Sequence, residues 1–149
     1  MAIIREAKAE DAKQIVDFQQ EMAFETEGLH LDKNILLSGV TAVFEHPEKG
    51  RYFLAQIDDT VVASLMITYE WSDWRSSTIF WIQSVFVQKA YRRQGIYRQL
   101  YDHVKTIAES DSQIGGIRLY VDKTNLTAQK TYANLGMNGE HYQVFEWMK

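Results

Sequence analysis

The sequence predicts an α+β fold of three layers, in which helices cover both faces of a mixed β-sheet. The first observation is the expected order of elements, β-α-α-β-β-β-α-β-α-β. The second is an apolar run over residues 78–87, which is too continuous for a surface edge and predicts a central strand. The third is the helix that follows this run, because its apolar residues recur at helical spacing. With 149 residues, one proline and no linker or repeat, the chain predicts a single domain, 1–149.

The first half of the chain predicts a strand, two amphipathic helices and a hairpin. Apolar residues at helical spacing mark the helices, and Pro47 ends the second of them. The turn Asp58-Asp59 joins the two strands of the hairpin. These elements are expected at Ala2–Glu6, Asp11–Glu25, Asp32–Glu45, Arg51–Ile57 and Val61–Trp71.

The second half predicts three strands and two helices. A polar turn leads into the central strand, and the helix after it carries one apolar face. Gly115 and Gly116 are expected to open the next strand, and Gly136 to stop the last helix. The expected ranges are Thr78–Val87 for the central strand, about 96–111 for its helix, Ile117–Val121, Thr127–Leu135 and a closing strand at Gln143–Met148.

Composition and charge exclude several classes of protein. A net charge of −4 argues against nonspecific nucleic-acid binding, which needs a basic face. No apolar run reaches the roughly 18–20 residues needed to cross a bilayer, so no membrane partner is expected. The lack of cysteine excludes disulfides and thiolate sites, and the four histidines show no metal-ligand spacing, so no metal is expected. No charged-then-apolar segment opens the chain, and these features together suit a cytoplasmic protein.

Residues 85–97 carry the strongest functional signal. An apolar run is followed by a basic turn with one glycine, Gly95, and then by a helix start. A helix N-terminus offers four unpaired N–H groups and the positive end of its dipole. The arginines and the glycine let an anionic phosphate approach that backbone. The segment predicts a phosphate-binding loop; a solvated basic helix start is the alternative.

Two motifs resemble those of the GNAT superfamily of acyl-CoA N-acyltransferases. Arg92-Arg93-Gln94-Gly95 matches most of the family's [Q/R]-x-x-G-x-[G/A] loop. The segment 125–137, Asn-Leu-Thr-Ala-Gln-Lys-Thr-Tyr-Ala-Asn-Leu-Gly-Met, resembles its N-x-x-A-x-x-x-Y-x-x-x-G-[F/M] segment. The expected element order is also that of the GNAT fold, so the resemblance spans nearly the whole chain and implies a mixed, mostly antiparallel sheet.

The resemblance implies an acetyl-CoA-dependent N-acetyltransferase. The acetyl group would pass directly to a primary amine of a small molecule, such as a polyamine, an amino acid or an amino sugar. Residues 68–75 are loosely similar to polyamine acetyltransferases, although those enzymes carry a Glu-Asp pair where this chain has Gln83-Ser84. The family also implies a homodimer. The alternatives are a non-catalytic acyl-CoA-binding sensor and an acetyltransferase acting on a peptide or protein amine; a nucleic-acid binder is disfavoured by charge.

The resemblance also implies which residues bind the cofactor. Backbone N–H groups at the helix start would hold the pyrophosphate, with two arginines as charged support, and the end of the central strand would pair with the pantetheine arm. One strand N–H would polarise the thioester carbonyl. Tyr97 stands where the family has Gly or Ala. The implied residues are Val85, Phe86, Val87, Arg92, Arg93, Gln94, Gly95, Ile96, Tyr97, Asn125 and Ala128.

Tyr132 is the expected general acid. It matches the family tyrosine that protonates the departing CoA thiolate, and a phenol with a pKa near 10 is a proton donor at neutral pH. A tyrosine packed under the sheet is the alternative.

The general base is not evident, since no acid occurs from Thr78 to Val87. Gln83 can position water or substrate but cannot accept a proton. Glu70 and Asp73 are the nearest acids in sequence, and Glu70 is the candidate base. Further possibilities are Glu27, Asp122 and a water chain to solvent.

Three tryptophans, Trp71, Trp74 and Trp81, occur close together in the sequence. They predict an aromatic wall that holds a cationic amine by cation–π contact, with Glu27 as a further substrate contact. Core and edge packing is the alternative.

Overall fold

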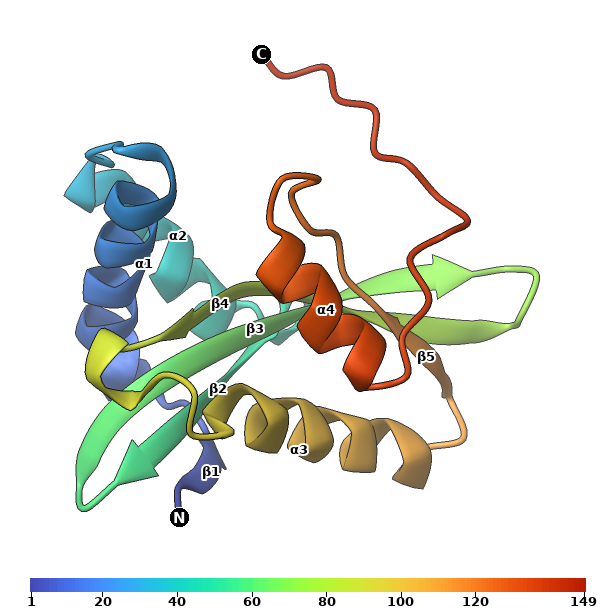
Figure 1. The fold of residues 1–149 in the computed structure, drawn as a ribbon, viewed down its shortest axis with the longest axis horizontal. Helices are drawn as coiled ribbons and strands as arrows, with labels where there is room; N and C mark the ends of the chain where they lie inside the picture. Colours follow the sequence, from blue (N-terminus) through green and yellow to red (C-terminus); the bar gives the residue numbers. More distant parts are fainter. The chain divides into compact units, whose positions relative to one another are not determined.

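The computed structural model describes residues 1–149, which form two compact units, Met1–Arg118 and Leu119–Lys149. The first unit contains the whole β-sheet and three α-helices, and the second contains one helix, α4 (Leu126–Asn134) (Figure 1). The single domain expected from the sequence stays a prediction.

The sheet has five strands in the order β1-β2-β3-β4-β5. Their bounds are Ile3–Glu6, Arg51–Ile57, Thr60–Ser72, Ser77–Val87 and Ile114–Arg118. The first four strands pair antiparallel, and β5 runs parallel to β4. The prediction of a mixed, mostly antiparallel sheet is therefore confirmed.

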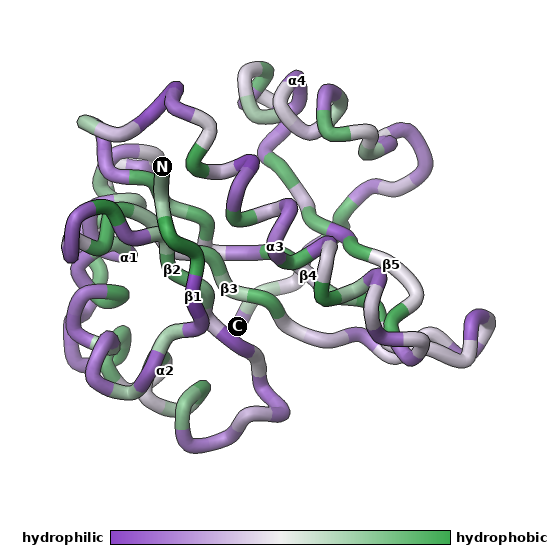
Figure 2. The backbone as a smooth tube through the Cα atoms, turned by 90° about the horizontal axis from the view of Figure 1, so that it is seen from below, coloured by the Kyte–Doolittle hydropathy of each residue, from purple (hydrophilic) through white to green (hydrophobic).

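Helices cover both faces of this sheet. Side chains alternate along a strand, and in β2 Leu54 packs with α1 (Ala12–Glu27) and α2 (Lys33–Glu45). The next side chain back, Phe53, faces α3 (Ile96–Ser110), and its ring centroid lies 5.4 Å from that of His103. Figure 1 shows α3 lying apart from the α1–α2 pair. Green and purple residues alternate along α1 and α2 in Figure 2, as expected for helices with one buried face.

The bounds of the elements up to α3 lie within two residues of those predicted, but β5 does not. Gly115 and Gly116 lie inside β5 and do not precede it. A Cβ atom added to Gly115 would collide with the Ser77 hydroxyl oxygen. Close approach to β4 is thus the reason for glycine at this position, and the strand ends at Arg118 rather than Val121.

The closing strand predicted at Gln143–Met148 is wrong. No helix or strand forms after α4, and Phe145 and Trp147 are 92% and 86% exposed. The segment has the alternation of a strand, but a strand is held by hydrogen bonds to a neighbouring strand, and none of the five pairs with it.

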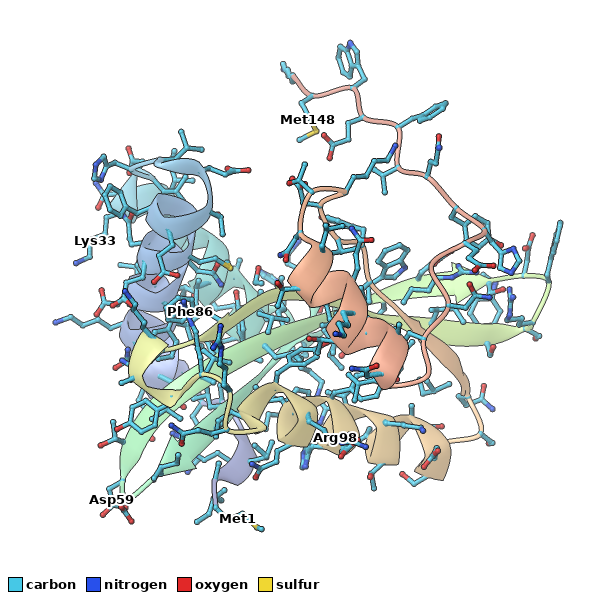
Figure 3. The ribbon with its side chains drawn as sticks, in the orientation of Figure 1. Met1, Lys33, Asp59, Phe86, Arg98 and Met148 are labelled. Carbon is cyan, nitrogen blue, oxygen red and sulfur yellow. The ribbon has the colours of Figure 1, made fainter.

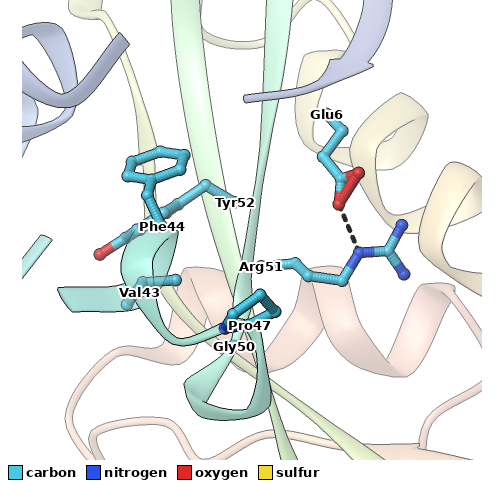
Figure 4. Close-up of a pocket in the computed structure, with 7 residues that line it drawn as sticks. All are labelled: Glu6, Val43, Phe44, Pro47, Gly50, Arg51 and Tyr52. Carbon is cyan, nitrogen blue, oxygen red and sulfur yellow. Dashed lines mark hydrogen bonds and ion pairs between the residues drawn. The ribbon is translucent and has the colours of Figure 1, made fainter. Parts of the chain in front are cut away.

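Gly50 lies where β2 begins, beside a pocket lined by Glu6, Val43, Phe44, Pro47, Gly50, Arg51 and Tyr52 (Figure 4). A Cβ at this buried position would stand 2.6 Å from the carbonyl oxygen of Ile67. We expect Gly50→Ala to lower the free energy of unfolding by about 1–3 kcal/mol, because backbone atoms must shift. Urea denaturation measures the change.

Gly39 provides the matched control. It is exposed within α2, and an added Cβ would meet no atom within 4 Å. Gly39→Ala should raise the free energy of unfolding by about 0.5–1 kcal/mol through helix propensity. Equal effects of the two substitutions would contradict the steric explanation.

Candidate functional site

The loop between β4 and α3 has the backbone geometry of an anion site. A short 3-10 turn is followed by Arg93 and Gly95, both in the left-handed region with φ of 62° and 76°. The backbone N–H groups of Gln94, Gly95 and Ile96 donate to no acceptor in the protein, and no side chain caps α3. A Cβ added at Gly95 would meet no atom within 4 Å. Open donors at a helix start suit a phosphate group.

Arg92 joins this loop to the end of β4 and to α1. Its Nε donates to the Val87 carbonyl oxygen at 2.8 Å, and its terminal nitrogen donates to the Glu25 carboxylate of α1 at 2.7 Å. The guanidinium also lies 5.5 Å from the ring centroid of Phe86. Phe86, which is labelled in Figure 3, in turn contacts Phe18 of α1, with ring centroids 5.1 Å apart. Both arginines expected to support a phosphate are exposed, but the Arg92 guanidinium is bound to protein groups.

The large side chain of Tyr97 is accommodated along α3. Its ring is half-buried and lies 6.5 Å, centroid to centroid, from the ring of Tyr101 one turn further on. Residues four apart share a helix face, and Tyr101 is only 6% exposed. The tyrosine that replaces the small family residue therefore packs on the buried side of the helix.

The last part of β4 has an open edge. Its pairing with β5 ends at Trp81 opposite Arg118, and from residue 82 to residue 87 only β3 pairs with it. Val85, Phe86 and Val87, expected to contact the pantetheine arm, lie on this stretch. An open edge offers backbone groups to an extended ligand that carries amides.

A β-bulge interrupts the same stretch. Ser64 pairs with Phe86 and Met66 with Gln83, so two β4 residues stand opposite one residue of β3. Ser84 carries the strain, with φ of 54° in the left-handed region. Nothing in the sequence marks this position, because serine is not a residue that favours positive φ.

A polar cluster lies on the sheet face just before the open edge. The indole N–H of Trp81 donates to Glu70 at 2.7 Å, and an Arg118 nitrogen donates to both Glu70 oxygens at 2.9 and 3.1 Å. Beside it, the Gln83 amide donates to the Thr68 hydroxyl at 3.2 Å. The hydrogen bonds from Trp81 and from Arg118 lower the pKa of Glu70. A lowered pKa makes a weaker base, and the role of Glu70 as the base stays a prediction.

The structure does not bring the three tryptophans together. Trp81 pairs with Thr68 of β3, and Trp71 stands three residues further along that strand, on the opposite face. Trp74 is 93% exposed in the turn between β3 and β4. Glu27 is exposed at the end of α1, so these residues occupy separate places.

The remaining predicted residues belong to the second unit. Asn125 caps α4, since its side-chain oxygen accepts a hydrogen bond from the Ala128 amide at 3.0 Å. Tyr132 lies half-buried on the same helix. Asp122 is exposed, and hydrogen bonds from Thr124 lower its pKa. The motif thus contains a helix cap in addition to the expected acid.

The sequence did not identify Glu25, Thr68 or Arg118 as parts of the site. Each is joined to a predicted residue by a contact that is long-range in sequence, up to 67 residues for Glu25 and Arg92.

None of the predicted residues lines the pocket of Figure 4. No group of histidine and acidic side chains has an arrangement that could hold a metal ion. None of the helices combines the length and the apolar character needed to cross a membrane.

Known proteins share this fold. A family model described as Acetyltransferase (GNAT) family matches residues 9–137. The chain is similar to a structure from Clostridium difficile 630 described as a possible acetyltransferase, with 44% identity, coverage of 100% of this chain and 98% of that chain, and a TM-score of 0.92. No curated protein matches the chain.

Two more distant structures show the fold alone. One is described as a predicted acetyltransferase with acetyl-CoA from Clostridium acetobutylicum, with 15% identity, coverage of 98% of this chain and 96% of that chain, and a TM-score of 0.76. The other is described as a transcriptional regulator from Bacillus halodurans C-125, with 21% identity, coverage of 99% of this chain and 100% of that chain, and a TM-score of 0.83.

Proposed function

Since this chain belongs to the acetyltransferase (GNAT) family and is an N-acetyltransferase, we propose that it moves an acetyl group from acetyl-CoA directly to the primary amine of a small molecule. The observation that carries the proposal is the start of α3, where the amides of Gln94, Gly95 and Ile96 are open to an anion. The pyrophosphate of CoA is such an anion. Exposed Arg93 adds charge at the same place.

The open edge of β4 supplies the second half of the donor site. The pantetheine arm carries two amides, and it can pair with residues 82–87 as a further strand would. We expect this pairing to bring the thioester near Gln83, which lies one residue into that stretch. A backbone N–H of Val85, Phe86 or Val87 then polarises the thioester carbonyl.

At the carbonyl carbon one bond forms and one breaks. The neutral amine nitrogen attacks the thioester carbonyl carbon and forms the N–C bond, the C–S bond breaks so that CoA leaves as a thiolate, and the nitrogen releases one N–H proton to water to give the neutral amide. Tyr132 gives its phenolic proton to that thiolate and regains one from solvent. An amine with a pKa near 10 is only about 0.1% neutral at pH 7, so its proton must be removed first.

The proton leaves the amine through water or a carboxylate. Gln83 holds a water or the acceptor itself, with its amide oriented by Thr68. Glu70 stands on the same sheet face, two residues from Thr68 along β3, but its lowered pKa favours water as the carrier. Asn125 and Ala128 are proposed to contact the cofactor arm.

The acceptor is proposed to be a polyamine, an amino acid or an amino sugar. A net charge of −4 favours a cationic molecule, with a modest effect at cellular salt. Trp71, Trp74, Trp81 and Glu27 are the proposed acceptor contacts, now as separate contacts and not as one aromatic wall. We also propose that the protein is a homodimer and acts in the cytoplasm.

A sensor that binds acyl-CoA without catalysis is the second candidate. It is favoured by the lack of any carboxylate from Ser77 to Val87. Thiol release from acetyl-CoA over polyamines, amino acids, amino sugars and short peptides separates the candidates. We expect release with at least one small amine. Thiol release with peptides alone would indicate that the acceptor is a peptide or protein amine. Thermal stabilisation of the protein by CoA without any thiol release would favour the sensor.

A further inference from the structure

The Glu70 carboxylate reaches the point where β4 loses its second neighbour. The last pair between β4 and β5 is Trp81 with Arg118, and β4 residues beyond it pair with β3 alone. The open edge that the donor site needs therefore begins directly after this pair. A group that holds this pair in place also fixes where the edge begins.

The Glu70 carboxylate contacts both members of that last pair. It comes from β3, where Glu70 stands opposite Ile79, and it accepts from Trp81 of β4 and from Arg118 of β5. Three strands are thus joined by one side chain on one face of the sheet. Backbone pairing alone joins each strand only to its immediate neighbour.

Opposite charges on Arg118 and Glu70 favour the contact between these two side chains. The shortest nitrogen–oxygen distance between Arg118 and Glu70 is 2.9 Å, and the two side chains are 27% and 40% exposed. The nearby Arg75 adds to the positive field that keeps Glu70 ionised. An exposed ion pair is weak by itself, but here the indole N–H of Trp81 fixes one oxygen and so reduces the freedom of the carboxylate.

We propose that Glu70 is a positioning residue, which clasps Trp81 and Arg118 and thereby sets the start of the open β4 edge that binds the pantetheine arm. The inference rests on the proposed use of acetyl-CoA. It gives Glu70 a role in the donor half of the reaction that does not require proton transfer.

The test compares Glu70→Gln, Arg118→Met and the double variant in acetyl-CoA binding and in kinetics. Glutamine keeps an acceptor for Trp81 but loses the charge that holds Arg118. We expect each single variant to raise the KM and Kd for acetyl-CoA about five- to tenfold, with kcat changed less than twofold. The double variant should be no worse than either single one, because the residues act as a unit. The acidic limb of the pH profile of kcat should stay where it is.

Glu6→Gln is the matched control. Glu6 forms an exposed ion pair with Arg51 between β1 and β2, so the same chemical change occurs on the same sheet away from the open edge. It should leave the KM for acetyl-CoA unchanged. Amide hydrogen exchange of Ile114–Arg118 gives a readout without ligand, and it should quicken in Glu70→Gln and not in Glu6→Gln.

Three results would overturn the proposal that Glu70 positions Trp81 and Arg118. One is an unchanged Kd for acetyl-CoA together with unchanged exchange in β5. Another is loss of kcat with loss of the acidic limb at constant Kd, which would make Glu70 the base. The third is additive effects of Glu70→Gln and Arg118→Met. If the unaltered protein binds no CoA, the proposed function fails, and the exchange experiment still tests the clasp. If Glu70→Gln does not fold, Arg118→Lys takes its place in both measurements.

Discussion

Replacing Tyr132 with Phe is expected to lower kcat by about a hundredfold or more, with little change in the Kd for acetyl-CoA. The phenol is the proposed donor to the departing thiolate, and general acids contribute roughly 10²–10⁴ in rate. Phe keeps the ring on α4 and removes only the phenolic hydroxyl, and with it the transferable proton. Steady-state kinetics and calorimetric titration with acetyl-CoA measure the two quantities.

Tyr142→Phe is the control for this substitution. Tyr142 lies in the same unit and is 79% exposed, and its hydroxyl has no proposed part in the chemistry. The Tyr142→Phe variant should have the same kcat as the unaltered protein. An alkaline limb in the pH profile of kcat should vanish in Tyr132→Phe if this hydroxyl is the acid. Equal kcat in both variants would remove Tyr132 from that role.

Gly95→Ala should raise the Kd for acetyl-CoA by about tenfold or more, or about 1.4 kcal/mol of binding free energy. The added methyl group would stand in the open space at the start of α3, where the pyrophosphate must approach the amides of Gly95 and Ile96. The φ of 76° also strains any residue with a side chain, at a cost of about 1–2 kcal/mol. Titration with acetyl-CoA and with CoA measures the loss.

Gly28→Ala separates the two effects. Gly28 ends α1 with φ of 64°, and a Cβ there would also meet no atom within 4 Å. Both variants should therefore lose similar stability in urea denaturation, and only Gly95→Ala should lose affinity. A similar Kd for the two variants would show that the phosphate does not use this loop.

Local patterns were sufficient to predict most elements of the first unit. Apolar spacing marks α1, α2 and α3 because each buries one face against the sheet, and the apolar run of β4 follows from burial on both sides. The same reasoning failed at Gln143–Met148, because alternation predicts the shape of a strand but not its partner. It also misplaced β5, where Gly115 is required by the proximity of Ser77 and does not mark a turn.

In the candidate site, too, local features could be predicted from the sequence and long-range contacts could not. The glycine loop before α3 is local, and the sequence predicted both its position and its open amides. The partners of its side chains are distant in sequence: Glu25 holds Arg92, and Arg118 lies 48 residues from Glu70. The separation of Trp71 and Trp81 depends on the register of β3 and β4, which spacing alone does not predict. Family resemblance adds residue identities but not these contacts.

The bulge at Ser84 lets β4 hold an extra residue while Phe86 stays on the same sheet face as Gln83. The two residues are three positions apart, a spacing that would put them on opposite faces of a regular strand, yet they stand opposite Ser64 and Met66, which share one face of β3. Loss of Ser84 would therefore restore regular alternation, with Phe86 still opposite Ser64 and directed toward Phe18. The deletion would remove the residue with positive φ and the local bend of the open edge, whereas a substitution at 84 would keep both.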